Sequence, residues 1–166
     1  MSMNPPVSIQ LPSDCEIVLT RQFRAPRDLV FRAMIEPTLV RRWLSGPPGW
    51  TMTDCEIDAQ VGGRYRYRWA SDDGQSMQMT GEYREVVAPE RLVNTETFDF
   101  GCASQAGEQV GTAVLTEANG VTTLTTTVVY PNKVARDGTL AAGMEHGVAN
   151  CYRLLDAILD EVSAAA

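Results

Sequence analysis

The feature that most constrains the fold is one long amphipathic helix predicted for residues 144–162. At 100° per residue its apolar side chains fall on a single stripe, while His146, Arg153, Asp156 and Asp160 fall on the opposite side. Such a helix must bury its apolar face against another element. The stripe and its immediate flank consist of Met144, Val148, Cys151, Tyr152, Leu155, Ile158, Leu159 and Val162.

Most of the chain before this helix is predicted to form strands joined by short turns, which favours an antiparallel meander. Asn119-Gly120 stands between two β-rich runs, and this dipeptide favours a tight hairpin turn. Pro26 opens a first short helix, and a second is predicted over 38–44. The predicted strands span residues 15–24, 50–57, 64–69, 76–87, 91–98, 110–117 and 121–130, with a polar connection at 102–108.

One helix cannot cover both faces of a flat sheet of this size, but a sheet that curls around the helix can bury it. The sequence therefore predicts an α+β fold in which a curved antiparallel sheet of about seven strands surrounds the C-terminal helix. Two short helices follow the first strand. We expect a flexible N-terminal tail over residues 1–14 and a single domain over residues 15–162.

Charge and residue counts exclude several classes of function. A net charge of −7 repels polyphosphate, so no nucleic-acid partner is expected. No apolar run approaches the ~20 residues of a membrane span, and no basic leader precedes the domain, which predicts a cytoplasmic protein. The chain has one histidine and widely spaced cysteines, so no metal site and no cofactor are expected; the cysteines are Cys15, Cys55, Cys102 and Cys151.

Aromatic and basic side chains alternate completely in the predicted strand over residues 64–69. Tyr65, Tyr67 and Trp69 share one face, and the arginines share the other. The aromatic face must point inward, because burying the arginines would be costly. In the next strand Met77, Met79 and Tyr83 form a similar set, interrupted by Gly81. These residues either form ordinary core or line a semi-polar cavity, and periodicity alone favours core.

A series of short motifs, in order along residues 15–159, resembles the START-like (SRPBCC) superfamily. Within it, the pattern is similar to homologues of the activator of the heat-shock-protein-90 ATPase. The motifs are 23–26 with 30–33, Pro37, Trp43, 47–50, 55–58, 61–65, 81–83, and 89–93 with 95–96.

The resemblance implies the helix-grip (START/pollen-allergen-like) fold, with a cavity between the sheet and the long helix. Eukaryotic activators carry an additional N-terminal domain, whereas only 14 residues precede the first strand predicted here, which argues against a chaperone partner. The ligand-binding residues expected on this basis are Trp43, Tyr65, Tyr67, Trp69, Met77, Met79, Tyr83, Phe98, Met144, Val148, Cys151, Tyr152 and Leu155.

Glu96 is the one candidate catalytic residue, since no nucleophile motif, phosphate loop or metal-ligand spacing is present. It shares a strand face with Leu92, Asn94 and Phe98. If that face points inward, Glu96 is a carboxylate in a cavity with a raised pKa. If residues 93, 95 and 97 face inward, it is a surface charge, and we favour this arrangement because Glu is rarely buried unpaired.

Three functions fit these observations. The leading hypothesis is a non-enzymatic carrier or sensor that binds a small hydrophobic molecule, lipid-like or aromatic. The second is an enzyme similar to the polyketide cyclases and aromatases of the superfamily, with Tyr65, Tyr67, Tyr83 and Glu96 as candidate proton-transfer groups. The third is a stress-related or co-chaperone-like interaction protein, which needs an exposed apolar patch. A homodimer is expected because such dimers are common.

Overall fold

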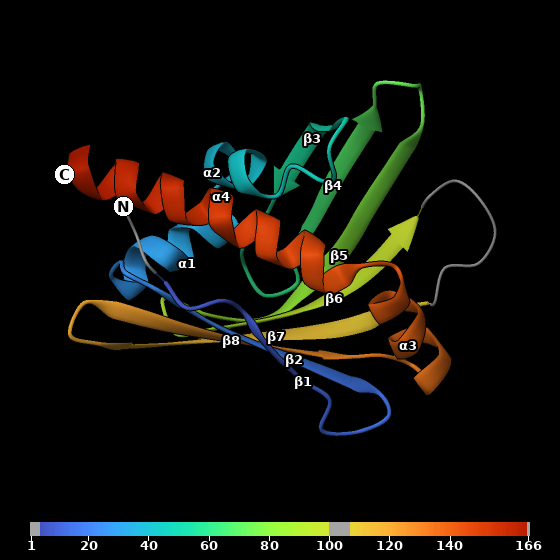
Figure 1. The fold of residues 1–166 in the computed structure, drawn as a ribbon, viewed down its shortest axis with the longest axis horizontal. Coiled ribbons are helices and arrows are strands. Elements are labelled where there is room, and N and C mark those ends of the chain that lie inside the picture. Colours follow the sequence, from blue (N-terminus) through green and yellow to red (C-terminus); the bar gives the residue numbers. More distant parts are fainter. Residues whose placement is uncertain (1–3, 100–106, 166) are drawn as a thin grey trace.

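A computed structural model describes residues 4–99 and 107–165 of the chain, which form a curved sheet with helices on its concave side (Figure 1). The sheet is antiparallel, and its eight strands lie in the order β1-β2-β8-β7-β6-β5-β4-β3. The strands are β1 (Ser8–Gln10), β2 (Glu16–Phe23), β3 (Trp50–Ile57), β4 (Arg64–Ser71), β5 (Ser76–Val87), β6 (Arg91–Asp99), β7 (Gln109–Ala118) and β8 (Val121–Val129). The helices are α1 (Arg27–Ile35), α2 (Pro37–Trp43), α3 (Lys133–Ala141) and α4 (Met144–Ala165).

This arrangement is the predicted α+β helix-grip fold, with α4 running across the hollow of the sheet (Figure 1). The turn between β7 and β8 confirms the hairpin prediction. Asn119 and Gly120 have φ angles of 54° and 76°, the left-handed values that a tight hairpin turn requires at both central positions.

The N-terminal segment differs from the expected flexible tail. Residues 8–10 form β1, which pairs with β2 and raises the strand number to eight. Ile9 packs against a cluster that contains Ile17 and Leu19, and the buried guanidinium of Arg136 donates to the carbonyl oxygen of Ser13 at 2.7 Å. These contacts stabilise a segment that the sequence had predicted to be a flexible tail.

Helix α3 is not among the predicted elements, because its residues show no long apolar stripe. It begins where the Asn132 side chain accepts a hydrogen bond from the backbone N–H of Ala135 at 2.8 Å. The polar connection predicted at 102–108 lies outside the described residues, except for Gly107 and Glu108.

The main core lies under the C-terminal half of α4, where α1 and α2 pack against it. Tyr152, Leu155, Ile158 and Leu159 are buried there, and the rings of Phe23 and Tyr152 meet edge to face at 5.4 Å. Trp43 donates its indole N–H to the Ala33 carbonyl at 2.8 Å. Seven expected ligand-binding residues belong to the buried core: Trp43, Tyr152 and Leu155 here, and Tyr65, Tyr67, Trp69 and Tyr83 on the sheet.

A buried ion pair joins β2 to α4. Arg21 is 7% exposed, and its two terminal nitrogens contact Asp156 at 2.9 and 2.6 Å. The guanidinium also lies 4.8 Å from the ring centroid of Phe23. Asp156 is therefore half-buried, although the helical periodicity had placed it on the polar side of the helix.

None of the helices in the described residues is long and apolar enough to cross a membrane.

Candidate functional site

Strand β4 presents its aromatic residues to the interior and its arginines outward. Tyr65, Tyr67 and Trp69 are each at most 6% exposed. On the opposite face, Arg66 contacts Asp54 at 2.8 Å and Glu56 at 3.0 Å. The predicted alternation is confirmed, and the cost of placing arginine on the sheet is reduced by ion pairs at the surface.

Three tyrosines form one packed group on this inner face. The ring centroid of Tyr65 lies 5.0 Å from that of Tyr67 and 5.4 Å from that of Tyr83. Burial raises the pKa of all three phenols, and raises that of Tyr83 to about 12. At neutral pH the three hydroxyls are therefore protonated and cannot act as bases.

Gly81 of β5 makes room for the Tyr65 ring. A β-carbon at position 81 would stand 1.9 Å from the Thr95 carbonyl oxygen and 2.6 Å from the Tyr65 hydroxyl. Without it, the Tyr65 hydroxyl donates to that carbonyl at 2.6 Å. Tyr65 is thus held by the backbone of β6.

The loop over residues 45–49 lies between Trp69 and helix α4. The Trp69 indole N–H donates to the Leu44 carbonyl at 2.8 Å, and a β-carbon on Gly46 would lie 3.3 Å from the Trp69 ring. The backbone of Gly46 lies close enough to the Cys151 thiol of α4 to oppose the rise in pKa that burial of the thiol causes. Trp69 therefore faces this loop, and Phe98 stacks on its ring at 6.2 Å.

Glu96 of β6 faces the interior, so the surface orientation favoured from the sequence is wrong. Its neighbours on the same strand face, Asn94 and Phe98, contact the inward-facing Tyr65 and Trp69 respectively. The physical reason is the pairing across β7. Gln109 stands directly opposite Glu96 and donates to its Oε1 at 2.7 Å, and Gly111 leaves space beside it.

The carboxyl group of Glu96 has amide partners but no cation. Burial raises its pKa, while the hydrogen bonds from Gln109 and Asn94 oppose that rise. All 14 Lys and Arg residues fall within the described ranges, and none forms an ion pair with Glu96 there. The two buried ones, Arg21 and Arg136, are engaged elsewhere.

Tyr130 extends this row of polar groups to β8. Val110 of β7 pairs with Val129, so the register places Gln109 beside Tyr130 and across from Glu96. The Tyr130 hydroxyl is buried, and within the described residues it has no hydrogen bond of ordinary geometry. Burial, assisted by the charge of Glu96, raises the pKa of Tyr130 to about 12, although Thr139 of α3 opposes the rise.

Half-buried apolar side chains of the N-terminal half of α4 pack against the cluster that contains Tyr130. The C-terminal half of α4, by contrast, contains the fully buried side chains of the main core. Val148 packs against both hydrophobic clusters of the protein. The expected ligand contacts that share this half-buried state are Met77, Met79, Phe98, Met144, Val148 and Cys151. We call Asn94, Glu96, Gln109 and this half-buried set the inner site.

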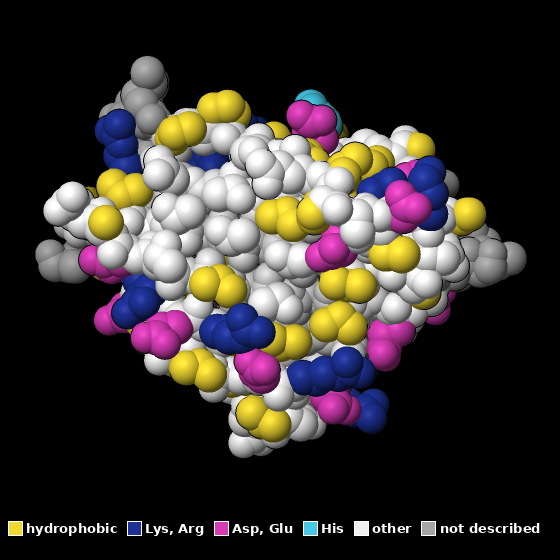
Figure 2. All heavy atoms as spheres, turned by 90° about the horizontal axis from the view of Figure 1, so that it is seen from below, with side chains coloured by type: hydrophobic (Ala, Val, Ile, Leu, Met, Phe, Trp, Pro, Cys, Tyr) yellow, Lys and Arg dark blue, Asp and Glu magenta, His cyan; other side chains and the backbone are white. Residues whose placement is uncertain are grey.

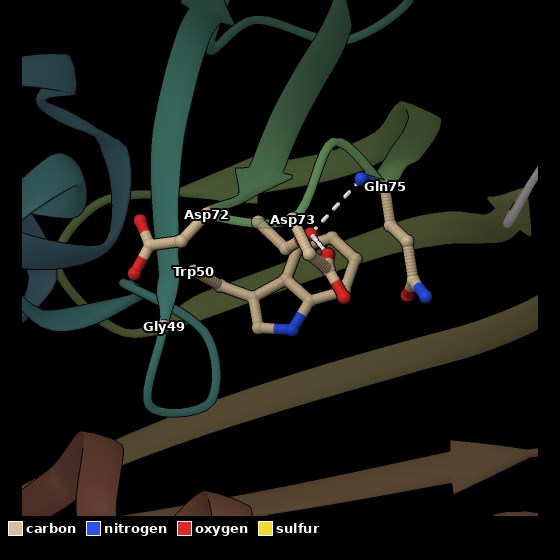
Figure 3. A pocket seen from close by; sticks show the side chains of 6 residues that line it. Gly49, Trp50, Asp72, Asp73 and Gln75 are labelled. Carbon is tan, nitrogen blue, oxygen red and sulfur yellow. Dashed lines mark hydrogen bonds between the residues drawn. The ribbon is translucent and has the colours of Figure 1, made fainter.

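Two surface hollows lie on the part of the molecule that β3, β4 and β5 form. One, of about 250 Å³, lies where the loop before β3 meets the β4–β5 turn, and Figure 3 shows Trp50 between Asp72 and Asp73 there. The second, of about 290 Å³, is lined by Thr53, Arg68 and Gln78 and also by Trp69 and by Met77, which belongs to the inner site. No group of three potential metal-ligating side chains occurs within residues 4–99 and 107–165.

The face seen from the side of β1, β2, β7 and β8 shows its hydrophobic side chains as separate spots (Figure 2). Basic and acidic side chains lie next to one another between them (Figure 2). This face therefore does not supply the continuous apolar patch that an interaction protein would need.

The family model described as Activator of Hsp90 ATPase homolog 1-like protein matches residues 24–160. A crystal structure of a Rhodobacter sphaeroides protein is similar, with a TM-score of 0.88 at 29% identity over 95% of this chain and 99% of that one.

Two further crystal structures share the fold. A Mycobacterium smegmatis protein has a TM-score of 0.80 at 23% identity, over 95% of this chain and 97% of its own. A Chromobacterium violaceum protein has a TM-score of 0.72 at 27% identity, over 87% of this chain and 96% of its own. No curated protein matches the chain.

Proposed function

The chain belongs to the Activator of Hsp90 ATPase homolog 1-like family, and we propose that it binds a small apolar molecule at the inner site. The observation that carries this proposal is the half-buried state of apolar side chains that face the interior. Burying them further removes apolar surface from water, at roughly 25 cal/mol per Å².

The chemistry of the inner site suits an apolar ligand. Met77, Met79 and Met144 have flexible, polarizable side chains that adapt to irregular shapes. A ligand site of this kind combines mostly apolar walls with a few convergent polar groups. Here the convergent groups are Asn94, Glu96 and Gln109.

An enzyme similar to the polyketide cyclases is the second candidate, favoured by one observation. The Asn94 amide links Tyr65 and Glu96, contacting the Tyr65 hydroxyl at 3.1 Å and Glu96 Oε2 at 3.5 Å. The Tyr65 hydroxyl already donates its proton to the Thr95 carbonyl, so of these two groups Glu96 is the one able to move a proton. We therefore rank binding above catalysis. The cytoplasmic location, the homodimer and a role in stress response stay predictions.

Titration with a neutral apolar fluorophore, N-phenyl-1-naphthylamine, tests the binding function. We expect saturable one-to-one binding by the wild type and an affinity about tenfold lower or worse for Val148→Trp, because the added ring fills the inner site. Val134→Trp is the matched control, since Val134 is 81% exposed on α3. Equal affinities of wild type and Val148→Trp would contradict binding at the inner site.

Native mass spectrometry of freshly purified protein provides an independent measurement. A mass above that of the denatured chain, lost on denaturation, would reveal a retained ligand directly. The same comparison with Val148→Trp should show less of the added mass.

A further inference from the structure

We propose that Glu96 anchors the polar end of the bound molecule, and that this end is a neutral hydroxyl group rather than a carboxylate. This inference rests on the proposed function, and it specifies which apolar molecules the inner site accepts. The ligand class is therefore an aliphatic or aromatic alcohol, with its hydroxyl on Glu96 and its carbon skeleton against α4.

The Glu96 carboxylate has hydrogen-bond acceptor positions that the protein itself does not fill. An ionised carboxylate offers about four acceptor positions on its two oxygens. Gln109 occupies one of them on Oε1, at 2.7 Å. Oε2 receives only the Asn94 amide at 3.5 Å, the outer limit of a hydrogen bond. That amide is shared, because it also contacts the Tyr65 hydroxyl at 3.1 Å and the Thr95 carbonyl at 3.3 Å.

Gly111 allows Glu96 to turn its carboxylate toward the inner face of the sheet. The side chain of Glu96 lies beside Gly111, whose missing β-carbon would stand 3.0 Å from Oε2. Glycine at this position gives the carboxylate the space that it occupies on the inner face of the sheet. Val148 and Met144 of α4 pack against the cluster that contains Tyr130, so a hydroxyl bound on the side of α4 would donate to Oε2.

The charge of Glu96 argues against a charged head group. An anionic head group bound next to Glu96 would place two negative charges within hydrogen-bonding distance of each other, and such charges repel strongly. No cation among the described residues pairs with Glu96 to offset this repulsion. A cationic head group would pair with Glu96, but it must first lose its hydration on entering an apolar site. A hydroxyl pays neither cost, because it is neutral and supplies the donor that Oε2 lacks.

The test compares three molecules with the same eight-carbon tail: 1-octanol, octanoate and octylamine. Each is titrated at pH 7.5 as a competitor of N-phenyl-1-naphthylamine bound to the full chain. We expect 1-octanol to displace the probe with an affinity about tenfold or more above that of octanoate, the size of a hydrogen bond to a charged group. Octylamine should bind more weakly than 1-octanol.

Variants separate the role of Glu96 from a general effect. Glu96→Gln should lose most of the preference for 1-octanol over octanoate, because the repelling charge is gone. Glu145→Gln removes an exposed carboxylate from α4 and should keep the wild-type order. Melting curves of both variants show whether each is folded.

Five outcomes overturn the inference. Equal affinities for all three molecules reject the head-group role of Glu96 while leaving apolar binding intact. If octylamine binds more tightly than 1-octanol, the inner site is a cation site instead. If the preference for 1-octanol over octanoate is unchanged in Glu96→Gln, the head group binds elsewhere. If none of the three displaces a bound probe, the hydroxyl assignment fails; if the probe itself does not bind, the proposed function fails with it.

Discussion

Glu96 and Gly111 lie side by side on neighbouring strands, and the carboxylate occupies the space that a side chain at position 111 would take. A β-carbon there would stand 3.0 Å from Glu96 Oε2 and 3.8 Å from Asn94 Oδ1. The absence of a side chain at Gly111 of β7 thus determines where the carboxylate of Glu96 on β6 can lie.

Gly111→Val is therefore expected to displace Glu96 and to narrow the inner site. Valine favours strands, so the fold should form, but two branched methyl groups collide with the carboxylate. The affinity for 1-octanol should fall about tenfold. Probe displacement measures the affinity, and circular dichroism confirms the fold. Wild-type affinity in a folded Gly111→Val variant would show that Glu96 does not need this space.

Gly81→Ala is expected to destabilise the protein by about 2 kcal/mol or more. The new β-carbon would stand 1.9 Å from the Thr95 carbonyl oxygen, so the backbone of β5 or β6 must move. Urea unfolding gives the free energy.

The matched control is Gly138→Ala in α3, where no atom lies within 4 Å of the added carbon. There alanine should stabilise the helix by about 0.5–1 kcal/mol. A loss of stability at both positions, or at neither, would contradict the steric explanation.

Asp156→Ala is expected to cost about 3–5 kcal/mol of unfolding free energy, because it leaves Arg21 buried without a counter-charge. The two side chains are only 8% and 15% exposed, so water cannot replace the lost partner. The double variant Arg21→Met, Asp156→Leu should recover most of this loss. Chemical denaturation of the single and double variants measures the coupling, and additive losses would show that the pair is not coupled.

The pKa of Glu96 is expected to lie above that of an exposed glutamate, and Gln109→Leu should raise it further by removing the donor at 2.7 Å. A carbon-13 carboxyl titration of the folded protein measures both values. Tyr65 and Tyr130 face Glu96 but do not titrate in the same pH range, because both phenols have raised pKa values, that of Tyr130 about 12. A lower pKa in Gln109→Leu would contradict the hydrogen bond.

The same shift predicts how stability depends on pH. Folding favours the neutral form of Glu96, so its contribution is fully present below the unfolded pKa and is lost as the pH rises through the folded pKa. Glu96→Gln should therefore gain in unfolding free energy relative to the wild type as the pH rises from below 4.5 to neutrality. Parallel pH profiles would show that Glu96 is not desolvated in the folded protein.

The strand pattern could be predicted because it depends on local alternation. Tyr65, Tyr67 and Trp69 must share one side of a strand, and arginines cannot take the buried side. The same reasoning could not place Trp69 against the loop over residues 45–49, since that contact joins segments separated in sequence.

The sequence by itself determined the order of the elements other than β1 and α3, and the apolar stripe of α4, because these follow from periodicities of two and 3.6 residues. It also determined the Asn119-Gly120 hairpin, which follows from the φ angles that this dipeptide tolerates. Only the tertiary structure decided that Glu96 faces inward and that Asp156 pairs with Arg21. Which side of β6 is interior depends on its register with β5, which shifts between Tyr83 and Glu85, and with Gln109 and Gly111 of β7. Arg21 and Asp156 are 135 residues apart, a distance that no local pattern spans.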